Sequence, residues 1–246
     1  MENIHGREPA VAAGKLSCTA IVCAYNEERT LENVLVTLLG SPLLDEIVVV
    51  DDGSHDGTPA ILGRYAKHKS MHAIRFAENR GKGWAMTEAA LNAHGDILLF
   101  ADADLRDLST DHIAQLLAPC LYGKADMVIG YPVRSQRIVD RIAPFRAISG
   151  ERALFRKDLL PIVEHIRTSG YGVETLINLY YRAERKRVRY ICLEGLTHLI
   201  KVEKVSPLEA LRMYVCEAFQ IVGAVAKTTA RRWLRMDGRE SLTETK

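Results

Sequence analysis

Ile97-Leu98-Leu99-Phe100-Ala101-Asp102-Ala103-Asp104 is the stretch of sequence that decides the fold. Its apolar first part predicts a buried strand over Asp96–Ala101. In an open parallel sheet, ligands bind beyond the carboxyl ends of the strands, where the D-x-D falls. Two carboxylates there are hard oxygen ligands that suit Mg²⁺ or Mn²⁺ bound to phosphate oxygens. The stretch therefore predicts an α/β fold with a metal and phosphate site at one edge of its sheet.

The residues on both sides alternate between strand-like and helix-like patterns. Further apolar strands are predicted at 16–24, 45–50, 72–76 and 125–130. Helical spacing is found at 27–39, 58–69 and 82–93 and around 111–121. Continuous apolar strands that alternate with helices predict a mostly parallel sheet covered on both faces.

The second half of the chain has a different rhythm. Residues 134–148 form a basic segment without a clear period, in which Arg134, Arg137 and Arg141 stand. A short strand and a helical start are predicted within 149–160, a helix at 171–185 and a strand at 188–193. A long amphipathic helix is predicted over 206–236, because Pro207 suits a first turn and an apolar stripe follows.

Composition excludes several classes of protein. The 246 residues are 48% hydrophobic and 26% charged, as in an average globular protein, and the net charge of +2 does not favour nucleic-acid binding. The five cysteines form no C-x-x-C pair, which argues against a zinc site or a disulfide framework. Residues 1–15 lack an apolar core and are expected to be a disordered lead. We expect a cytoplasmic protein, free or peripheral at the inner face of a membrane.

Polar residues end two more predicted strands. Ala24-Tyr25-Asn26-Glu27 follows the first strand, where Asn26 could also cap the next helix. Asp51-Asp52-Gly53-Ser54 follows the second, and two adjacent carboxylates after an apolar run are costly unless something uses them. Asn79-Arg80-Gly81-Lys82-Gly83 opens a helix and is a candidate anion site, with a solvated loop as the alternative.

These motifs together resemble the family 2 glycosyltransferases, which have a Rossmann-like GT-A fold. The segments AYNEE (24–28), VVVDDGSHDGT (48–58), NRGKG (79–83) and ADAD (101–104) stand in the family's order and spacing. The resemblance implies that the first motif, Asp52 and Gly53 line a nucleoside pocket and that Lys82 meets the donor. It also implies that Asp102 and Ala103 bind the sugar nucleotide, while Asp104 is the catalytic metal ligand for Mg²⁺ or Mn²⁺.

The second half resembles the acceptor side of glucosyl-3-phosphoglycerate synthases. The matching segments are Ser149-Gly150-Glu151-Arg152-Ala153 and Ser169-Gly170-Tyr171-Gly172-Val173-Glu174. The resemblance implies that Gly150, Glu151, Arg152, Tyr171, Gly172 and Glu174 bind the acceptor. It places His198 as a further metal ligand. The synthases are usually longer, and their first motif differs, so the likeness indicates a site more firmly than an acceptor.

The predicted organisation is one GT-A domain over 16–246. Residues 16–131 form its nucleotide-sugar half, residues 132–205 its acceptor half, and residues 206–236 its C-terminal helix. Glu174 is either the base of an inverting reaction or an acceptor ligand in a retaining one, and the sequence leaves both open. The donor is a UDP- or GDP-sugar, and the acceptor a small anionic molecule or a polyprenyl phosphate.

Two other functions remain as alternatives. A sugar-1-phosphate nucleotidyltransferase shares a related sheet, but its first loop is basic and rich in glycine, whereas AYNEE is acidic. The other is a degenerate, non-catalytic transferase module at a membrane, which the intact Asp52, Lys82, Asp102 and Asp104 disfavour. The C-terminal helix either packs on the domain or lies on a membrane surface through its basic end. A homodimer is also left open.

Overall fold

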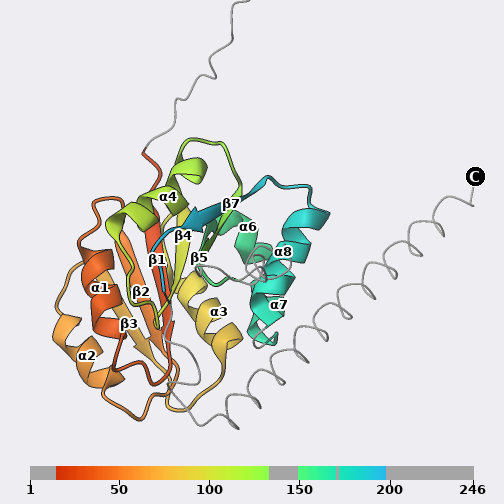
Figure 1. Ribbon diagram of the computed structural model, residues 1–246. Coiled ribbons are helices and arrows are strands. Elements are labelled where there is room, and N and C mark those ends of the chain that lie inside the picture. Colours follow the sequence, from red (N-terminus) through yellow and green to blue (C-terminus); the bar gives the residue numbers. More distant parts are fainter. Residues whose placement is uncertain (1–14, 133–148, 170–171, 198–246) are drawn as a thin grey trace, which may run out of the picture.

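The computed structural model describes residues 15–132, 149–169 and 172–197 of the chain (Figure 1). Predictions that concern residues 1–14, the basic segment 134–148 and the helix at 206–236 lie outside the described residues. Tyr171 and His198 lie outside them as well. Within the described ranges, no helix has the length and apolar composition needed to cross a membrane.

A seven-stranded sheet forms the centre of the described structure, in the order β3-β2-β1-β4-β6-β5-β7. Its strands are β1 (Cys18–Ala24), β2 (Glu46–Asp51), β3 (Met71–Arg75), β4 (Ile97–Asp102), β5 (Met127–Pro132), β6 (Arg152–Phe155) and β7 (Val188–Leu193). All neighbours pair in parallel except β6, which runs antiparallel to both β4 and β5. The predicted mostly parallel α/β sheet is confirmed.

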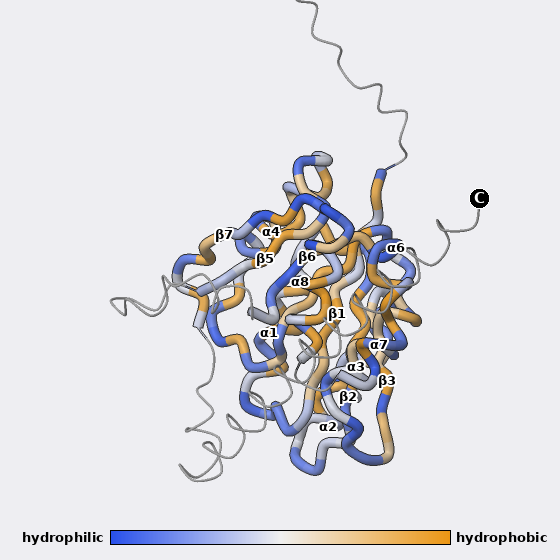
Figure 2. Tube along the Cα trace, turned by 90° about the vertical axis from the view of Figure 1, so that its right-hand side faces the viewer, coloured by the Kyte–Doolittle hydropathy of each residue, from blue (hydrophilic) through white to orange (hydrophobic). Residues whose placement is uncertain are grey.

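Helices cover both faces of the sheet, as Figure 1 shows. They are α1 (Leu31–Leu39), α2 (Thr58–Tyr65), α3 (Lys82–Asn92), α4 (Thr110–Leu121), α6 (Arg156–Leu159), α7 (Val163–Arg167) and α8 (Val173–Ala183), with a 3₁₀ turn η2 at Leu160–Ile162. Side chains of β1 alternate between two apolar clusters: Ala20 and Val22 join that of α1 and α4, and Ile21 joins that of α3, α7 and α8. The central strands, such as β1, are accordingly drawn in the hydrophobic colour in Figure 2.

The start of α1 differs from the prediction. The helix begins at Leu31 with Thr30 as its N-cap, four residues later than expected. Asn26 does not cap it, because its backbone takes a left-handed conformation with φ of 56° and its side chain bonds elsewhere. The turn between them is closed by the Glu27 carbonyl, which accepts hydrogen bonds from the amides of Thr30 and Leu31.

Three other elements differ from the prediction. The helix α2 ends at Tyr65 rather than at 69, and α7 was not predicted at all. Five residues are too few to show a helical period, so α7 leaves no clear signal in the sequence. The strand β6 was expected, but not its antiparallel place between β4 and β5, which puts a segment of the predicted acceptor half inside the sheet.

Candidate functional site

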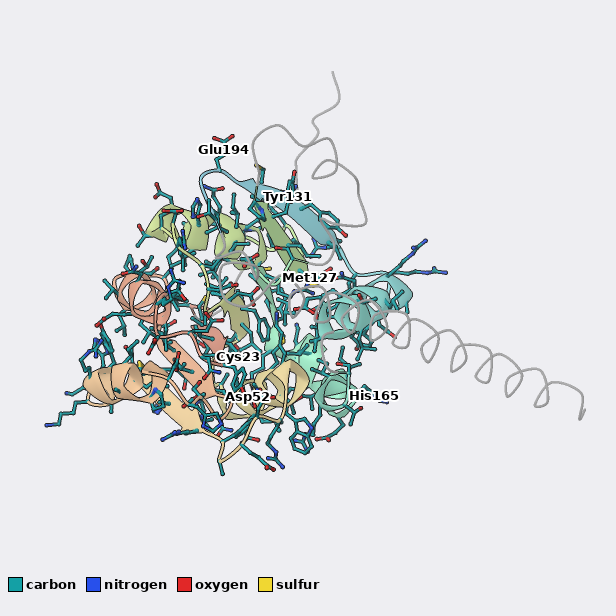
Figure 3. All side chains as sticks on the ribbon, turned by 60° about the horizontal axis from the view of Figure 1, so that its bottom comes forward. Cys23, Asp52, Met127, Tyr131, His165 and Glu194 are labelled. Atoms are coloured by element: carbon teal, nitrogen blue, oxygen red, sulfur yellow. The ribbon has the colours of Figure 1, made fainter. Side chains whose placement is uncertain are left out.

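The ends of β1, β2 and β4 bring three predicted motifs to one edge of the sheet. Ala24 pairs with Asp51 on one side of β1, and Cys23 pairs with Asp102 on the other. Figure 3 turns this edge toward the viewer, with Cys23 and Asp52 near its middle. Because parallel strands end at the same edge, the motif after each strand faces the same region.

The loops after β1 and β2 are joined by hydrogen bonds between side chains and backbone. The amide of Asn26 donates to Ser54 Oγ at 2.9 Å, and Asn26 Oδ1 accepts from the His55 amide at 2.9 Å. The amide of Glu27 donates to Thr58 Oγ1 at 2.8 Å. Tyr25, in the same loop, leaves 43% of its surface exposed. The backbone of the first motif is therefore fixed, with an aromatic ring open to a ligand.

Both carboxylates of the second motif have partners. Asp51 is fully buried, and its Oδ2 lies 3.2 Å from Arg75 Nε. Asp52 accepts a hydrogen bond from the Arg80 amide at Oδ1 (2.7 Å) and from the Gly81 amide at Oδ2 (2.9 Å). Burial raises the pKa of Asp52, and these two amides oppose the rise. Asp52 thus ties the end of β2 to the loop that carries Lys82.

Gly53 allows these two segments to approach closely. Its φ of 75° is left-handed, and a Cβ there would lie 2.6 Å from the Asn79 nitrogen. Only glycine fits such a position without a shift of the backbone. The backbone amide of the neighbouring Asp52 donates to the Ala24 carbonyl at 2.8 Å. Asp52 and Gly53 thus hold this edge of the sheet together through their backbones.

Lys82 lies at the centre of the site. As the first residue of α3, it places its Nζ 3.1 Å from Asp102 Oδ1 and 2.6 Å from Glu174 Oε1. Burial alone would lower the pKa of Lys82, but the charges of Asp102 and Glu174 raise it well above its usual value. One ammonium thus joins the end of β4 to the first turn of α8. Predicted donor and acceptor residues meet there.

The D-x-D residues occupy different surroundings. Asp102 keeps 31% of its side chain exposed, whereas Ala103 is 3% exposed and belongs to the apolar core. Asp104 follows in a turn and is partly exposed. Gly150 approaches so closely that a Cβ there would overlap the Asp102 carboxylate, with Cγ at 2.7 Å. The structure therefore brings Gly150 next to the D-x-D.

Arg152 and Glu151 are buried beneath this surface. The Arg152 side chain is 0% exposed and donates to the carbonyl of Ser149 at 2.5 Å, to Asn178 Oδ1 at 3.3 Å and to the carbonyl of Glu174 at 3.5 Å. Burial lowers the pKa of Arg152. Glu151 Oε2 accepts from Ser149 Oγ at 2.5 Å. The guanidinium of Arg152 thus fixes the segment before β6 to α8.

Gly172 is the N-cap of α8, and Glu174 stands in the first turn of that helix. Tyr171 and His198 belong to the residues that the structure does not describe. Among those it does describe, no group of three or more histidine, cysteine, aspartate or glutamate residues could hold a metal ion. Asp102 and Asp104 are thus the described carboxylates that the D-x-D offers to a cation.

The sequence reading missed two residues next to the site. Cys23 stands beside Asp102 in the register, and burial raises the pKa of its thiol to about 12. Asn178, one helical turn after Glu174, contacts the guanidinium of Arg152. Aligning the predicted strands at 16–24 and 96–101 would have placed Cys23 next to the D-x-D. The i, i+4 spacing would have placed Asn178 on the same face of the predicted helix as Glu174.

A comparison with known families decides the membership of the chain. The model of "Glycosyl transferase family 2" matches residues 19–189, which is more than half of the chain. The chain belongs to glycosyl transferase family 2. The match includes the three strand-end motifs, the NRGKG segment and the predicted acceptor segments.

Curated relatives of this family 2 chain include enzymes with different names. Glycosyltransferase AglD of Haloferax volcanii is 35% identical over 168 residues, which cover 62% of this chain and 26% of that protein. Dolichyl-phosphate beta-glucosyltransferase of Drosophila melanogaster is 42% identical over 101 residues, or 36% and 31% of the two chains. Glucosyl-3-phosphoglycerate synthase of Mycobacterium tuberculosis is 30% identical over 129 residues, or 50% and 40%. The matches thus span well under half of each relative.

Solved structures of the Mycobacterium tuberculosis synthase share the fold. In its complex with Mn²⁺, uridine diphosphate and phosphoglyceric acid, the synthase superposes with a TM-score of 0.67 at 24% identity. The alignment covers 86% of this chain and 78% of that one. The GT-A architecture expected from the sequence is therefore confirmed.

Proposed function

We propose that this chain transfers a sugar from a nucleotide-diphosphate donor, a UDP- or GDP-sugar, to an acceptor, with Mg²⁺ or Mn²⁺. The observation that carries the proposal is the contact of Lys82 with both Asp102 and Glu174, at 3.1 and 2.6 Å. One cation there joins the D-x-D of the donor half to the first turn of the acceptor helix. Family membership supplies the reaction class.

The D-x-D residues fit a divalent cation of the hard type. Mg²⁺ is usually held by one or two carboxylates, while substrate phosphates and water complete its coordination. Asp102, partly exposed at the end of β4, and Asp104, in the following turn, are carboxylates of this kind. Such a cation would neutralise charge on the departing nucleoside diphosphate. In this proposal Asp104 is the direct ligand and Asp102 chiefly binds the sugar nucleotide.

The other donor residues are assigned by their places around the edge. The exposed ring of Tyr25 and the Asp52 carboxylate face the nucleoside side, where Asp52 keeps lone pairs for an N–H of the base. Lys82 meets the diphosphate, because it follows Gly81 at the start of α3 and its ammonium lies beside Asp102. These assignments place the nucleoside over β1 and β2 and the diphosphate near β4.

Glu174 is the acceptor-side carboxylate nearest to the proposed reaction centre. Its side chain is 5% exposed and shares Lys82 with Asp102 of the D-x-D. There it can accept a hydrogen bond or the proton of an acceptor hydroxyl. Two relatives named above, the dolichyl-phosphate glucosyltransferase and the phosphoglycerate synthase, carry phosphate-bearing acceptors in their names. We therefore infer a phosphate-bearing acceptor for this chain.

A donor screen tests the proposal. The purified chain is incubated with UDP- and GDP-sugars and Mn²⁺, and release of the nucleoside diphosphate is measured with and without phosphate-bearing acceptors. We expect slow hydrolysis of one donor class, faster with the right acceptor and lost in Asp104→Ala. Release of pyrophosphate from a nucleoside triphosphate and a sugar 1-phosphate would instead support a nucleotidyltransferase. No turnover and no metal-dependent nucleotide binding would support a non-catalytic module.

A further inference from the structure

The structure leaves a phosphate-bearing acceptor without the cation that the sequence suggested for it. The guanidinium of Arg152 is fully buried and donates only to groups of the protein itself. Lys82 is already assigned to the diphosphate of the donor, and Arg75 is paired with Asp51. Further donors to an anionic group at this edge are found among the described residues. Two arginines near the Lys82 loop supply them.

These are Arg80 and Arg167, which stack on one indole ring. The guanidinium carbon of Arg80 lies 4.1 Å from the ring centroid of Trp84, and that of Arg167 lies 4.9 Å from it. Arg80 also lies over Phe76, at 5.4 Å. The two guanidinium carbons are thus no more than about 9 Å apart. We call these three residues, Arg80, Trp84 and Arg167, the arginine–tryptophan cluster.

The cluster stands where the donor and acceptor segments come together. Arg80 precedes Lys82 by two residues, and Asp52 fixes its position by accepting a hydrogen bond from its amide. Arg167 is the last residue of α7 and leads into the segment that ends at Glu174. Because Lys82 and Glu174 touch, the two segments that carry the cluster meet at the proposed reaction centre.

The charges of the cluster are only partly balanced within the described residues. The guanidinium of Arg80 has its two ring contacts there and no direct ion pair, although its charge acts on Asp52 from a distance. Arg167 has one carboxylate partner, Glu164 at 3.2 Å, whose side chain is 66% exposed. The Nε of Arg167 is buried and has no hydrogen-bond partner there. Stacking on Trp84 accounts for the position of the side chains but leaves most of their N–H donors unused.

A phosphate monoester matches this arrangement. Two like charges on one ring repel each other, and an anion between them relieves the repulsion. A phosphate that accepts charge-assisted bonds of about 2.8 Å from two guanidinium groups allows their carbons to lie at most roughly 8 Å apart. That separation is within the limit set by the shared ring.

We propose that Arg80 and Arg167, stacked on Trp84, form a binding site for the phosphate monoester of the acceptor. This proposal rests on the transferase function only in identifying the bound molecule as the acceptor. Phosphate binding itself does not depend on the donor. The phosphate can belong to a soluble molecule or to a polyprenyl chain in a membrane, and both present the same dianionic group.

Trp84 is the natural reporter for this site. The chain has two tryptophans, Trp84 and Trp233, so a full-length Trp233→Phe protein carries Trp84 alone. Its emission is followed at constant ionic strength during titration with glycerol 3-phosphate, and separately with neutral phosphatidylcholine vesicles that contain dolichyl phosphate. We expect a saturable change with one of these sources. A response to glycerol 3-phosphate assigns a soluble acceptor, and a response only to the vesicles assigns a lipid one.

Matched variants decide whether the cluster is responsible. Arg80→Gln and Arg167→Gln are each expected to weaken phosphate binding roughly tenfold or more, the loss typical of one charge-assisted hydrogen bond. Arg64→Gln is the control, because Arg64 is an exposed arginine of α2 paired with Glu32. No saturable response to either phosphate, or equal affinity in the Arg80→Gln/Arg167→Gln double variant, would overturn the proposal.

A second measurement separates this proposal from the transferase function. Calorimetric binding of uridine diphosphate with Mn²⁺ is measured in every variant, and we expect the glutamine variants to retain it, which also shows that they are folded. If the unaltered chain binds glycerol 3-phosphate but no nucleotide, the transferase proposal fails and the phosphate site stands. If it binds the nucleotide but no phosphate, the phosphate site fails alone.

Discussion

The two sides of the proposed site are held by different interactions. On the nucleoside side, the loops after β1 and β2 are joined by hydrogen bonds between side chains and amides, such as those of Ser54 and Thr58. On the diphosphate side, ion pairs hold the side chains of Lys82, Asp102 and Glu174 together. Bonds to the backbone fix the loops before a ligand arrives, whereas the side-chain ion pairs of Lys82 can be exchanged for contacts with a charged ligand. We infer that the first side shapes the pocket and the second performs the chemistry.

The largest effect is expected from Lys82→Met. It leaves Glu174, 4% exposed, without its ammonium, so the free energy of unfolding should fall by about 2–3 kcal/mol, less than for a fully buried pair because Asp102 is partly exposed. The donor kcat/KM should fall roughly 10- to 150-fold for the lost charged contact. Urea unfolding and donor kinetics measure the two quantities. Lys157→Met, at an exposed lysine of α6, is the control, and equal behaviour of both variants would refute a special role for Lys82.

The contribution of Lys82 should not decrease as the pH rises through the neutral range. The folded protein raises the pKa of Lys82 above the ordinary value, so the stability from its charged form is fully present below about pH 10 and is lost as the pH rises further. The difference in unfolding free energy between the unaltered chain and Lys82→Met should therefore not shrink as the pH is raised from about 6 to about 9. A difference that shrinks as the pH rises within that window would contradict the assigned ion pairs.

Substitution of a glycine beside the Lys82 ion pairs should lower activity far more than substitution of a glycine elsewhere. Gly150→Ala drives a Cβ into the Asp102 carboxylate, so we expect lower donor kcat/KM and weaker metal-dependent nucleotide binding. Gly63→Ala is the matched control, because nothing lies within 4 Å of a Cβ at that position in α2. It should leave activity intact and raise stability by about 0.5–1 kcal/mol, as alanine does in a helix. Unchanged kinetics in Gly150→Ala would break the link between this glycine and the D-x-D.

The smallest effect is expected on the nucleoside side. Ser54→Ala removes the acceptor of the Asn26 amide and should lower the free energy of unfolding by about 1 kcal/mol. The donor KM should rise by no more than about fivefold, the factor that 1 kcal/mol represents, while kcat stays close to normal. A large loss of kcat would show that the nucleoside side takes part in the chemistry and would remove the contrast between the two sides.

The local pattern of the sequence predicted the strand ends well but not what lies around them. Apolar runs located β1, β2 and β4 and put Asp52 and Asp102 at one edge, because parallel strands end together. The antiparallel insertion of β6 could not be read, since β-pairing joins segments far apart in the sequence. The burial of Arg152 was missed for the same reason: its partners Ser149 and Asn178 come together only after β6 and α8 have packed.

Calorimetric titration with uridine diphosphate, in Mn²⁺ and in metal-free buffer, tests the central claim most directly. The unaltered chain, Asp104→Ala and the control Asp111→Ala, at an exposed carboxylate in the first turn of α4, are compared. We predict Mn²⁺-dependent binding in the unaltered chain and in Asp111→Ala, and its loss in Asp104→Ala, with all three proteins folded. Equal nucleotide affinity with and without Mn²⁺, or full Mn²⁺-dependent binding by Asp104→Ala, would contradict the account of the D-x-D as the donor and metal site.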